Sequence, residues 1–226
     1  MFSAIIVAAG GSRRMGFDKL SALLAGKPVL AHTVDAFCNC SAVDEIILVC
    51  STENENWVKE IASTATQSDK ITAVVRGGAE RHFSVWNGIE ATNPAADLIG
   101  VHDGARPLVT SEAITMCALV ARTTGAATLG HPITDTVKRC DADDFVGEPV
   151  DRNGLWAMET PQIFHASVLR TAYQTILASS ELVTDEVSAV QAISHPVKVV
   201  ASDRPNLKIT YPADLALASR LIADQL

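Results

Sequence analysis

Short apolar runs alternate with helix-like segments along the first 130 residues of this chain, and this alternation limits the possible folds more than any other feature. The apolar runs lie at 3–9, 45–50, 71–75, 97–102 and 126–130, and the helix-like segments at 28–38, 54–65, 80–92 and 111–123. Strands that alternate with helices at this spacing form a mostly parallel sheet. We therefore expect an α/β fold with helices on both faces of the sheet.

The segment 134–152 departs from this rhythm. It contains two short strand-like pieces, at 134–139 and 145–151, on either side of an acidic turn, and it lacks the apolar residues of a core element. We expect a β-arm that projects from the domain. Further helices are expected around 169–177, at 184–193 and from Pro212 onward. The sequence thus predicts a single domain over residues 1–226 that includes this arm.

Composition limits the function classes. The 226 residues are 48% hydrophobic and 19% charged, which is typical of a globular domain rather than a disordered chain. The net charge of −8 argues against a broad basic face for nucleic acid or an anionic membrane. The five cysteines lack C-x-x-C or zinc-finger spacing, so reduced thiols are the simplest interpretation. With neither a signal peptide nor an apolar run of about 20 residues, a cytoplasmic protein is expected.

The loop after the first strand, residues 8–19, is rich in small and basic residues. Small residues let backbone N–H groups approach a phosphate, and two Arg and one Lys follow them. Neither P-loop spacing nor the G-x-G-x-x-G fingerprint is present, which disfavours a dinucleotide-dependent oxidoreductase. The pattern indicates a polyphosphate cradle, and an ordinary strand-to-helix turn with solvated arginines is the alternative.

Two later loops also carry polar residues where strands end. Gly77 and Gly78 precede Ser84 after the third apolar run, and Asp103 and Arg106 share the loop after the fourth. In isolation these would be a helix start and a surface ion pair. In an open parallel sheet, however, ligands bind outside the carboxyl ends of the strands. An Asp at such a place can hold Mg²⁺ that is bound to phosphates, so we expect Asp103 to be a metal ligand, directly or through water.

Five further polar motifs lie in the second half of the chain. For each of them a turn residue, a helix cap or a solvated charge is the more common explanation. The six histidines show no ligand spacing and the serines no nucleophile elbow, so zinc and covalent catalysis are not favoured. The motifs are Asp135-Thr136, Asp151-Arg152, Thr160-Pro161-Gln162, Thr184-Asp185-Glu186 and Lys208-Ile209-Thr210.

The order of these motifs resembles one enzyme family. AAGGSRRM with Lys19, GGAER with Ser84, HDGARP, TDTVKR, VDRNGLW, TPQ, TDE and NLKIT follow one another across nearly the whole chain. Together they resemble the 2-C-methyl-D-erythritol 4-phosphate cytidylyltransferases of the non-mevalonate isoprenoid pathway. The first motif is shared by many nucleotidyltransferases, so HDGARP, VDRNGLW and NLKIT give the resemblance its specificity.

The resemblance implies a Rossmann-like nucleotidyltransferase fold and a reaction in which methylerythritol phosphate attacks the α-phosphate of CTP in line and releases pyrophosphate. The cofactor it implies is Mg²⁺ or another divalent cation. It also implies that Arg14 and Lys19 stabilise the transition state and that Arg152 and Lys208 align the substrate phosphate. The positions that match CTP contacts are Ala8, Ala9, Gly10, Gly11, Gly78, Ser84, Asp103 and Gly104. Those that match methylerythritol phosphate contacts are Asp103, Arg106, Thr136, Arg152, Thr160 and Lys208. Family members are homodimers whose arms exchange, so Thr136 and Arg152 are expected to serve the partner's site.

The chain departs from the family pattern at two places, and two rival functions stay open. The loop between Arg14 and Lys19 is shorter than usual, and Ala79 stands where an Asp is common. One rival is a cytidylyltransferase for ribitol 5-phosphate, which the Asp-Arg-Asn-Gly-Leu-Trp run at 151–156 disfavours. The other is a nucleotide-binding regulatory module without catalysis, and the presence of both Arg14 and Lys19 argues against it.

Overall fold

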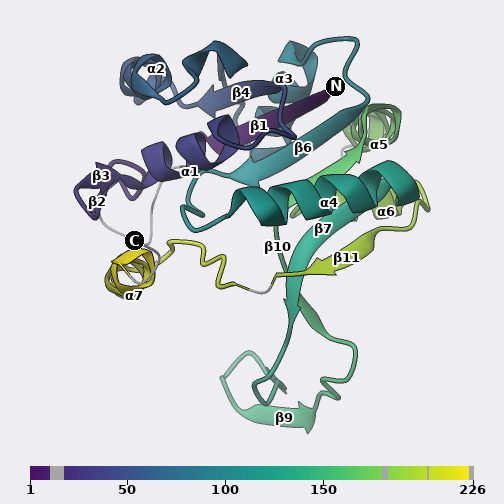
Figure 1. The fold of residues 1–226 in the computed structure, drawn as a ribbon. Coiled ribbons are helices and arrows are strands. Elements are labelled where there is room, and N and C mark those ends of the chain that lie inside the picture. Colours follow the sequence, from purple (N-terminus) through teal and green to yellow (C-terminus); the bar gives the residue numbers. More distant parts are fainter. Residues whose placement is uncertain (11–17, 180–182, 203, 224–226) are drawn as a thin grey trace.

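The computed structural model describes residues 1–10, 18–179, 183–202 and 204–223, and over these ranges its centre is a seven-stranded sheet (Figure 1). The strand order is β11-β7-β10-β6-β1-β4-β5, in which β10 runs antiparallel to β6 and β7 while the other neighbours pair in parallel. The expected mostly parallel α/β sheet is therefore confirmed. The strands are β1 (Phe2–Ala8), β4 (Glu45–Cys50), β5 (Ile71–Arg76), β6 (Leu98–Asp103), β7 (Ala126–Pro132), β10 (Trp156–His165) and β11 (Lys198–Ala201).

Helices cover both faces of the sheet, as alternate residues of β1 show. Ala4 and Ile6 belong to an apolar cluster with α1, α2 and α4, whereas Ile5 belongs to a cluster with α3, α5 and α6 (Figure 1). Successive side chains of a strand point to opposite faces, so a strand covered on both sides is apolar at nearly every position. The helices are α1 (Val29–Cys38), α2 (Glu55–Thr64), α3 (Arg81–Ala91), α4 (Ser111–Thr124), α5 (Ala166–Ser179) and α6 (Glu186–Ala192), and a short 3₁₀ helix, η1, spans Ser68–Lys70.

The sequence does not indicate β10 and β11. β10 contains three buried polar residues, Glu159, Thr160 and Gln162, and its pairing with β7 shifts register between Met158 and Gln162. These polar groups are bonded to residues distant in the sequence, which a search for local apolar runs cannot detect. β10 therefore lies inside the sheet although its composition resembles that of a loop.

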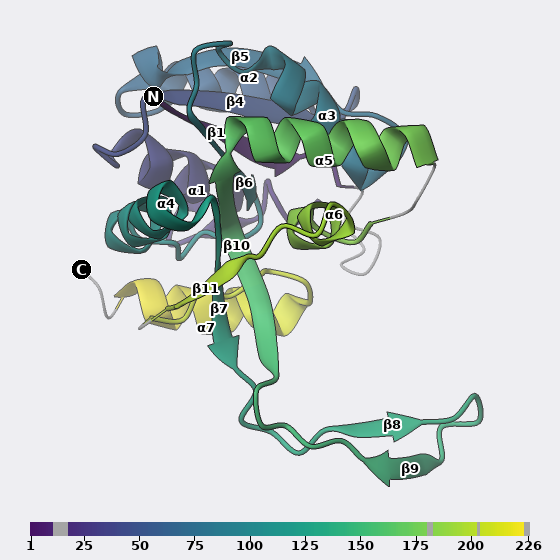
Figure 2. The same cartoon turned by 90° about the vertical axis from the view of Figure 1, so that its right-hand side faces the viewer.

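A two-stranded hairpin of β8 (Lys138–Cys140) and β9 (Val146–Pro149) stands away from the rest of the chain (Figure 2). All the residues of both strands are exposed. The strands are shorter than the expected 134–139 and 145–151, and those bounds are wrong. A two-stranded ribbon without a packed apolar face is only marginally stable, which keeps its regular part short.

The C-terminal helix α7 (Pro212–Ala223) begins at the expected Pro212. It lies beside a small hairpin of β2 (Leu23–Leu24) and β3 (Lys27–Pro28), where Leu24, Ile209 and Ala218 form a third apolar cluster. This packing holds residues 206–209 near the end of β6, because the Ile209 N–H donates to the Ala105 carbonyl at 2.8 Å. No helix within the described ranges has the length and apolar composition that a membrane span requires.

Candidate active site

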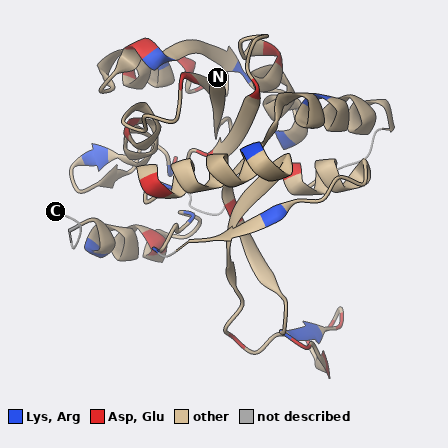
Figure 3. Ribbon diagram, turned by 45° about the vertical axis from the view of Figure 1, so that its right-hand side comes forward, with Lys and Arg blue, Asp and Glu red and all other residues tan. Residues whose placement is uncertain are grey.

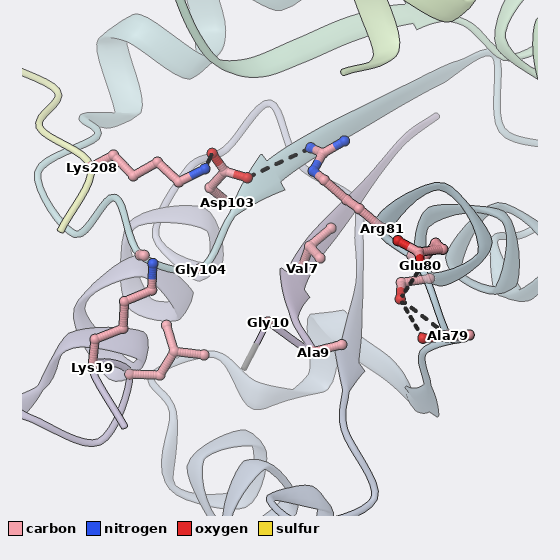
Figure 4. A pocket seen from close by; sticks show the side chains of 14 residues that line it. Val7, Ala9, Gly10, Lys19, Ala79, Glu80, Arg81, Asp103, Gly104 and Lys208 are labelled. Carbon is pink, nitrogen blue, oxygen red and sulfur yellow. Dashed lines mark hydrogen bonds and ion pairs between the residues drawn. The ribbon is translucent and has the colours of Figure 1, made fainter. Parts of the chain in front are cut away.

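A pocket of about 260 Å³ lies where β1 and β6 end and where the loop after β5 leads into α3 (Figure 4). The carboxyl ends of parallel strands meet at one edge of a sheet, which is why loops far apart in the sequence line one pocket. Predicted site residues among its lining are Ala9, Gly10, Lys19, Gly78, Ser84, Asp103, Gly104 and Lys208. Val7, Leu20, Ala79, Glu80, Arg81 and Ala105 complete it.

At Gly78 and Gly104 the wall of the pocket is formed by backbone alone. A Cβ atom on Gly78 would lie 2.4 Å from Cβ of Phe83, and one on Gly104 would lie 3.0 Å from the Val7 carbonyl oxygen. Any side chain at either position would therefore displace its neighbours. The Gly78 N–H donates to Ser84 Oγ at 3.1 Å, which ties the loop after β5 to the first turn of α3.

Asp103, at the end of β6, is surrounded by three cationic side chains. Its carboxylate lies 2.8 Å from Lys208 Nζ, 3.4 Å from Arg106 Nε and 3.6 Å from Arg81 Nη2. Burial alone would raise the pKa of Asp103, but Lys208, Arg81 and Arg106 outweigh burial and hold that pKa well below its usual range. Asp103 is therefore an anion that holds Lys208 and Arg81, which line the pocket, and Arg106, which lies beside it.

Arg81 is a pocket residue that the predicted site lacks. Its guanidinium donates to both carboxylate oxygens of the fully buried Glu186, at 2.5 and 3.0 Å, and Glu186 also accepts from the Tyr173 hydroxyl at 2.9 Å. The Glu186 carboxylate raises the pKa of Arg81 further. The signal that could have found it is its position in the GGAER motif, shortly before Ser84.

Thr160 and His102 lie behind Asp103 and fix the end of β6. The Thr160 hydroxyl accepts from the Asp103 N–H at 3.0 Å and lies 3.1 Å from His102 Nδ1, while His102 Nε2 lies 3.3 Å from the Arg106 carbonyl oxygen. Complete burial lowers the pKa of His102 to about 3, so the ring is neutral. A proton on Nε2 satisfies all of these contacts, since the Thr160 hydroxyl can then donate to Nδ1. Thr160, expected to bind substrate, is thus nearly fully buried here and supports Asp103.

Arg106 is anchored beside a second cavity of about 480 Å³, which it and Lys208 line together. Its Nη1 donates to the Asn206 carbonyl at 2.8 Å. The Asn206 amide in turn donates to Glu159 Oε2 at 3.0 Å and to the Thr160 carbonyl at 2.7 Å. β10 therefore holds the loop that carries Lys208, an arrangement that local sequence patterns do not indicate.

Other predicted site residues are not in this pocket. Thr136 and Arg152 are exposed near the base of the arm, where Arg152 donates to the Thr134 carbonyl. Ala8 is almost fully buried, and its carbonyl accepts from the Asn54 amide at 3.0 Å. Gly11 and Arg14 lie outside the described residues.

The pocket offers little protein ligation for a metal ion. Within the described ranges, no group of three or more His, Cys, Asp or Glu side chains is placed to hold one. Asp103 supplies one carboxylate at the pocket, and Mg²⁺ that is bound to phosphates typically takes only one or two. The residues present therefore fit an ion that reaches the pocket with a polyphosphate.

Comparisons with known proteins point to one family. The family model for 2-C-methyl-D-erythritol 4-phosphate cytidylyltransferase matches residues 2–224. The chain is 39% identical over 218 residues to a protein of that name from Caldanaerobacter subterraneus subsp. tengcongensis, with 96% of each chain covered. A namesake from Alkaliphilus metalliredigens is 37% identical over 222 residues, covering 97% of this chain and 92% of the relative.

The fold comparison agrees with the sequence comparison. The crystal structure of 4-diphosphocytidyl-2C-methyl-D-erythritol synthase from Anaerococcus prevotii superposes with a TM-score of 0.86 at 31% identity. The alignment covers 98% of this chain and 96% of that chain. Sequence and fold therefore agree over nearly the whole chain.

Proposed function

The chain belongs to the 2-C-methyl-D-erythritol 4-phosphate cytidylyltransferase family, and from this premise we propose how its residues carry out the reaction. The enzyme transfers CMP from CTP to 2-C-methyl-D-erythritol 4-phosphate and yields 4-diphosphocytidyl-2-C-methyl-D-erythritol and pyrophosphate. One observation carries the assignment of the site: a glycine-walled pocket at the strand ends contains the Asp103 carboxylate, which is held by three cations.

The reaction joins two strongly anionic molecules, so positioning and charge neutralisation are the main requirements. A phosphate oxygen of methylerythritol phosphate attacks the α-phosphorus of CTP. A new P–O bond forms as the bond to the oxygen between the α- and β-phosphorus breaks, and pyrophosphate leaves with that electron pair. The attacking phosphate is already ionised near neutral pH, so no general base is needed.

We assign the CTP site to the backbone of residues 8–11, to Gly78 with Ser84 and to Asp103 with Gly104. In this assignment Gly10 and Gly78 lie on the walls, where the absence of a side chain lets the nucleotide approach the backbone closely. Arg14 and Lys19 offset the charge that develops on the α-phosphate and on the departing pyrophosphate. In support of this, Lys19 lines the pocket on the side opposite Arg81 (Figure 4).

We assign the methylerythritol phosphate site to the region around Asp103, Arg106 and Lys208. Lys208 lines both the pocket and the adjoining cavity, and Arg106 lines the cavity, so a substrate phosphate there would meet two positive charges. Thr160 belongs to this site through its bond to the Asp103 N–H. Bound Mg²⁺, held by Asp103 directly or through water, would lower the negative charge on the nucleotide phosphates.

The arm completes the site in trans under this proposal. Thr136 and Arg152 lie outside their own chain's pocket, and the arm that carries them projects from the body (Figure 2). A homodimer in which each arm reaches the other subunit would bring them to the substrate phosphate. Phe145 and Val146 at the arm's end support a protein contact there, since these apolar side chains are 71% and 69% exposed. The single-domain organisation and the cytoplasmic location stay predictions.

Pyrophosphate release tests the function directly. The purified protein is incubated with CTP, Mg²⁺ and either methylerythritol phosphate or ribitol 5-phosphate, and the product is identified by mass. We expect turnover with methylerythritol phosphate and little with ribitol 5-phosphate. A preference for ribitol 5-phosphate would overturn the substrate assignment, and CTP binding without pyrophosphate release would identify a regulatory module.

A further inference from the structure

Arg81 differs from the other two cations that surround Asp103. Among the described residues, it alone of the three is also bound by a second carboxylate, that of Glu186. Arg81 begins α3, Glu186 begins α6, and Tyr173 lies on α5, so three helices on one face of the sheet meet at this contact. Glu186 is separated from Arg81 by 105 residues in the chain.

The Glu186 carboxylate is buried, and both of its oxygens have hydrogen-bond partners. Its side chain is 0% exposed, and burying a carboxylate is costly unless it is paired and hydrogen-bonded. Two Arg81 N–H groups and the Tyr173 hydroxyl donate to it. Burial, together with the Glu186 carboxylate, raises the pKa of Tyr173 well above its ordinary value, so the phenol remains a donor. Loss of Arg81 would leave the buried carboxylate without its charge partner, whereas loss of the Tyr173 hydroxyl would remove one of its three donors.

The pairing changes what Arg81 can do in the pocket. A guanidinium has five N–H donors in a rigid plane, and Glu186 occupies two of them. Because the Glu186 carboxylate offsets most of its positive charge, Arg81 serves the pocket mainly as a set of fixed donors. Arg81 lines the pocket together with Gly78, Ser84 and Asp103, and Figure 4 shows the guanidinium directed toward Asp103.

We propose that Glu186 is a positioning residue for nucleotide binding, that it acts through Arg81, and that Tyr173 supports it. This proposal rests on the proposed function, since it requires the pocket to be the CTP site. Arg81 presents its remaining N–H groups to oxygen atoms of the bound nucleotide. The ion pair with Glu186 keeps the Arg81 guanidinium from moving closer to Asp103, so that Asp103 stays paired with Lys208.

A double-mutant cycle on steady-state kinetics tests this proposal. We expect Glu186→Gln to raise the KM for CTP about tenfold, to change kcat less than threefold and to leave the KM for methylerythritol phosphate within twofold, because binding energy common to ground and transition states is lost. Arg81→Met should do the same. Since Glu186 acts only through Arg81, the double variant should match Arg81→Met. An additive effect of the two substitutions would overturn the proposal.

A matched control separates positioning from general stability. Glu45 is also a buried carboxylate, 5% exposed, and it accepts from Ser3 Oγ, Thr72 Oγ1 and the Asn93 N–H. Glu45 is the first residue of β4, and the pocket lies at the other, carboxyl ends of the strands. Glu45→Gln should lower Tm and leave the KM for CTP unchanged. If it raised this KM as much as Glu186→Gln does, the effect of Glu186 would be structural and the proposal would fail.

Tyr173→Phe keeps the test open if Glu186→Gln does not fold. It removes one donor to Glu186 and leaves the ring packed, so the KM for CTP should rise two- to threefold in the native background. In the Arg81→Met background it should have no effect on that KM. A rise in both backgrounds, or in neither, would contradict the proposal. Wild-type turnover in the same assay tests the proposed function separately, since its absence would refute that function whatever the variants do.

Discussion

Asp103 illustrates how one residue organises a site built from distant parts of the chain. Its own loop contributes Arg106, the start of α3 contributes Arg81, and the segment before α7 contributes Lys208. A carboxylate so surrounded stays ionised at any physiological pH, because its pKa is held well below the ordinary value. The charge that Asp103 contributes is therefore constant, and the cations around it are held in fixed directions.

Lys19 gives the simplest test at the residue scale. We predict that Lys19→Ala lowers kcat by a factor on the order of 10² to 10³, as expected for the loss of one preorganised charge stabiliser. Lys198 on β11 is an exposed lysine outside the pocket, and Lys198→Ala serves as the matched control with unchanged kcat. Near-native turnover of Lys19→Ala, measured by pyrophosphate release, would remove Lys19 from the mechanism.

His102 makes stability depend on pH. Burial lowers its pKa from 6.5 to about 3, with Asp103 opposing the change and Arg106 assisting it. The unfolded chain therefore binds a proton that the folded chain does not, and the free energy of unfolding falls as pH drops below about 6.5 until it levels near pH 3. We predict a loss of about 1 kcal/mol between pH 6 and pH 5 from this residue.

Urea unfolding at a series of pH values measures this slope. His102→Gln, which cannot take up the proton, should be less stable near pH 7 and should show a correspondingly flatter profile in this range. If the free energy of unfolding changed equally for the wild type and for His102→Gln between pH 6 and pH 5, the assignment of a neutral, buried His102 would be wrong.

At the scale of elements, α4 shows how local signals set helix bounds. The Thr110 hydroxyl accepts from the Ala113 N–H at 3.2 Å at the start of the helix, and Gly125 ends it with φ of 85°. A side chain on Gly125 would be strained by this φ and would lie 2.8 Å from the His195 ring. Both signals are visible in the sequence, which is why the expected segment 111–123 agrees closely with Ser111–Thr124.

Removal of the Thr110 cap should affect stability without affecting catalysis. Thr110→Ala is expected to lower the free energy of unfolding by about 1 kcal/mol, because the Ala113 N–H loses its partner. Chemical denaturation measures the change, and kcat should stay at the native value because Thr110 does not line the pocket. Thr123→Ala, near the other end of α4, removes an exposed hydroxyl and should cost much less. Equal losses for the two variants would show that the cap contributes nothing specific.

At the scale of the whole molecule, charge and shape bear on assembly. The net charge of the chain is −8. Acidic and basic residues are interspersed on the helices and on the arm (Figure 3). Anionic substrates must therefore meet cations gathered locally, as around Asp103. The arm is the other large-scale feature, since it carries Arg152 away from its own pocket.

Mixed dimers test whether the arm completes the partner's site. Lys19→Ala and Arg152→Ala should each be nearly inactive alone. In a mixed dimer, the pocket of the Arg152→Ala subunit would receive a native arm and regain activity, while the other pocket would carry both defects. Equal amounts that exchange freely should recover about a quarter of native activity, since about half the dimers are mixed and each has one good site. No recovery, with dimer exchange verified by light scattering of tagged chains, would refute arm exchange.

The sequence by itself determined the α/β class, the strands β1, β4, β5, β6 and β7, the helices between them and most of the pocket's lining. These depend on local patterns, because apolar runs, helical periodicity and glycine loops each act over a few neighbouring residues. The order of strands in a parallel sheet then brings the loops that follow them to one edge. Local patterns and this one topological rule are therefore enough to place Gly78, Ser84, Asp103 and Gly104 in one pocket.

Only the tertiary structure decided which side chains meet there. β10 inserts antiparallel between β6 and β7 with polar residues inside, and this places Thr160 behind Asp103 and Glu159 beside Asn206. Arg81 on α3 and Glu186 on α6 form an ion pair between two helices, although in the sequence each residue alone looks like a solvated charge. Such contacts depend on how distant elements pack, and a buried polar group is tolerated only where that packing supplies its partner.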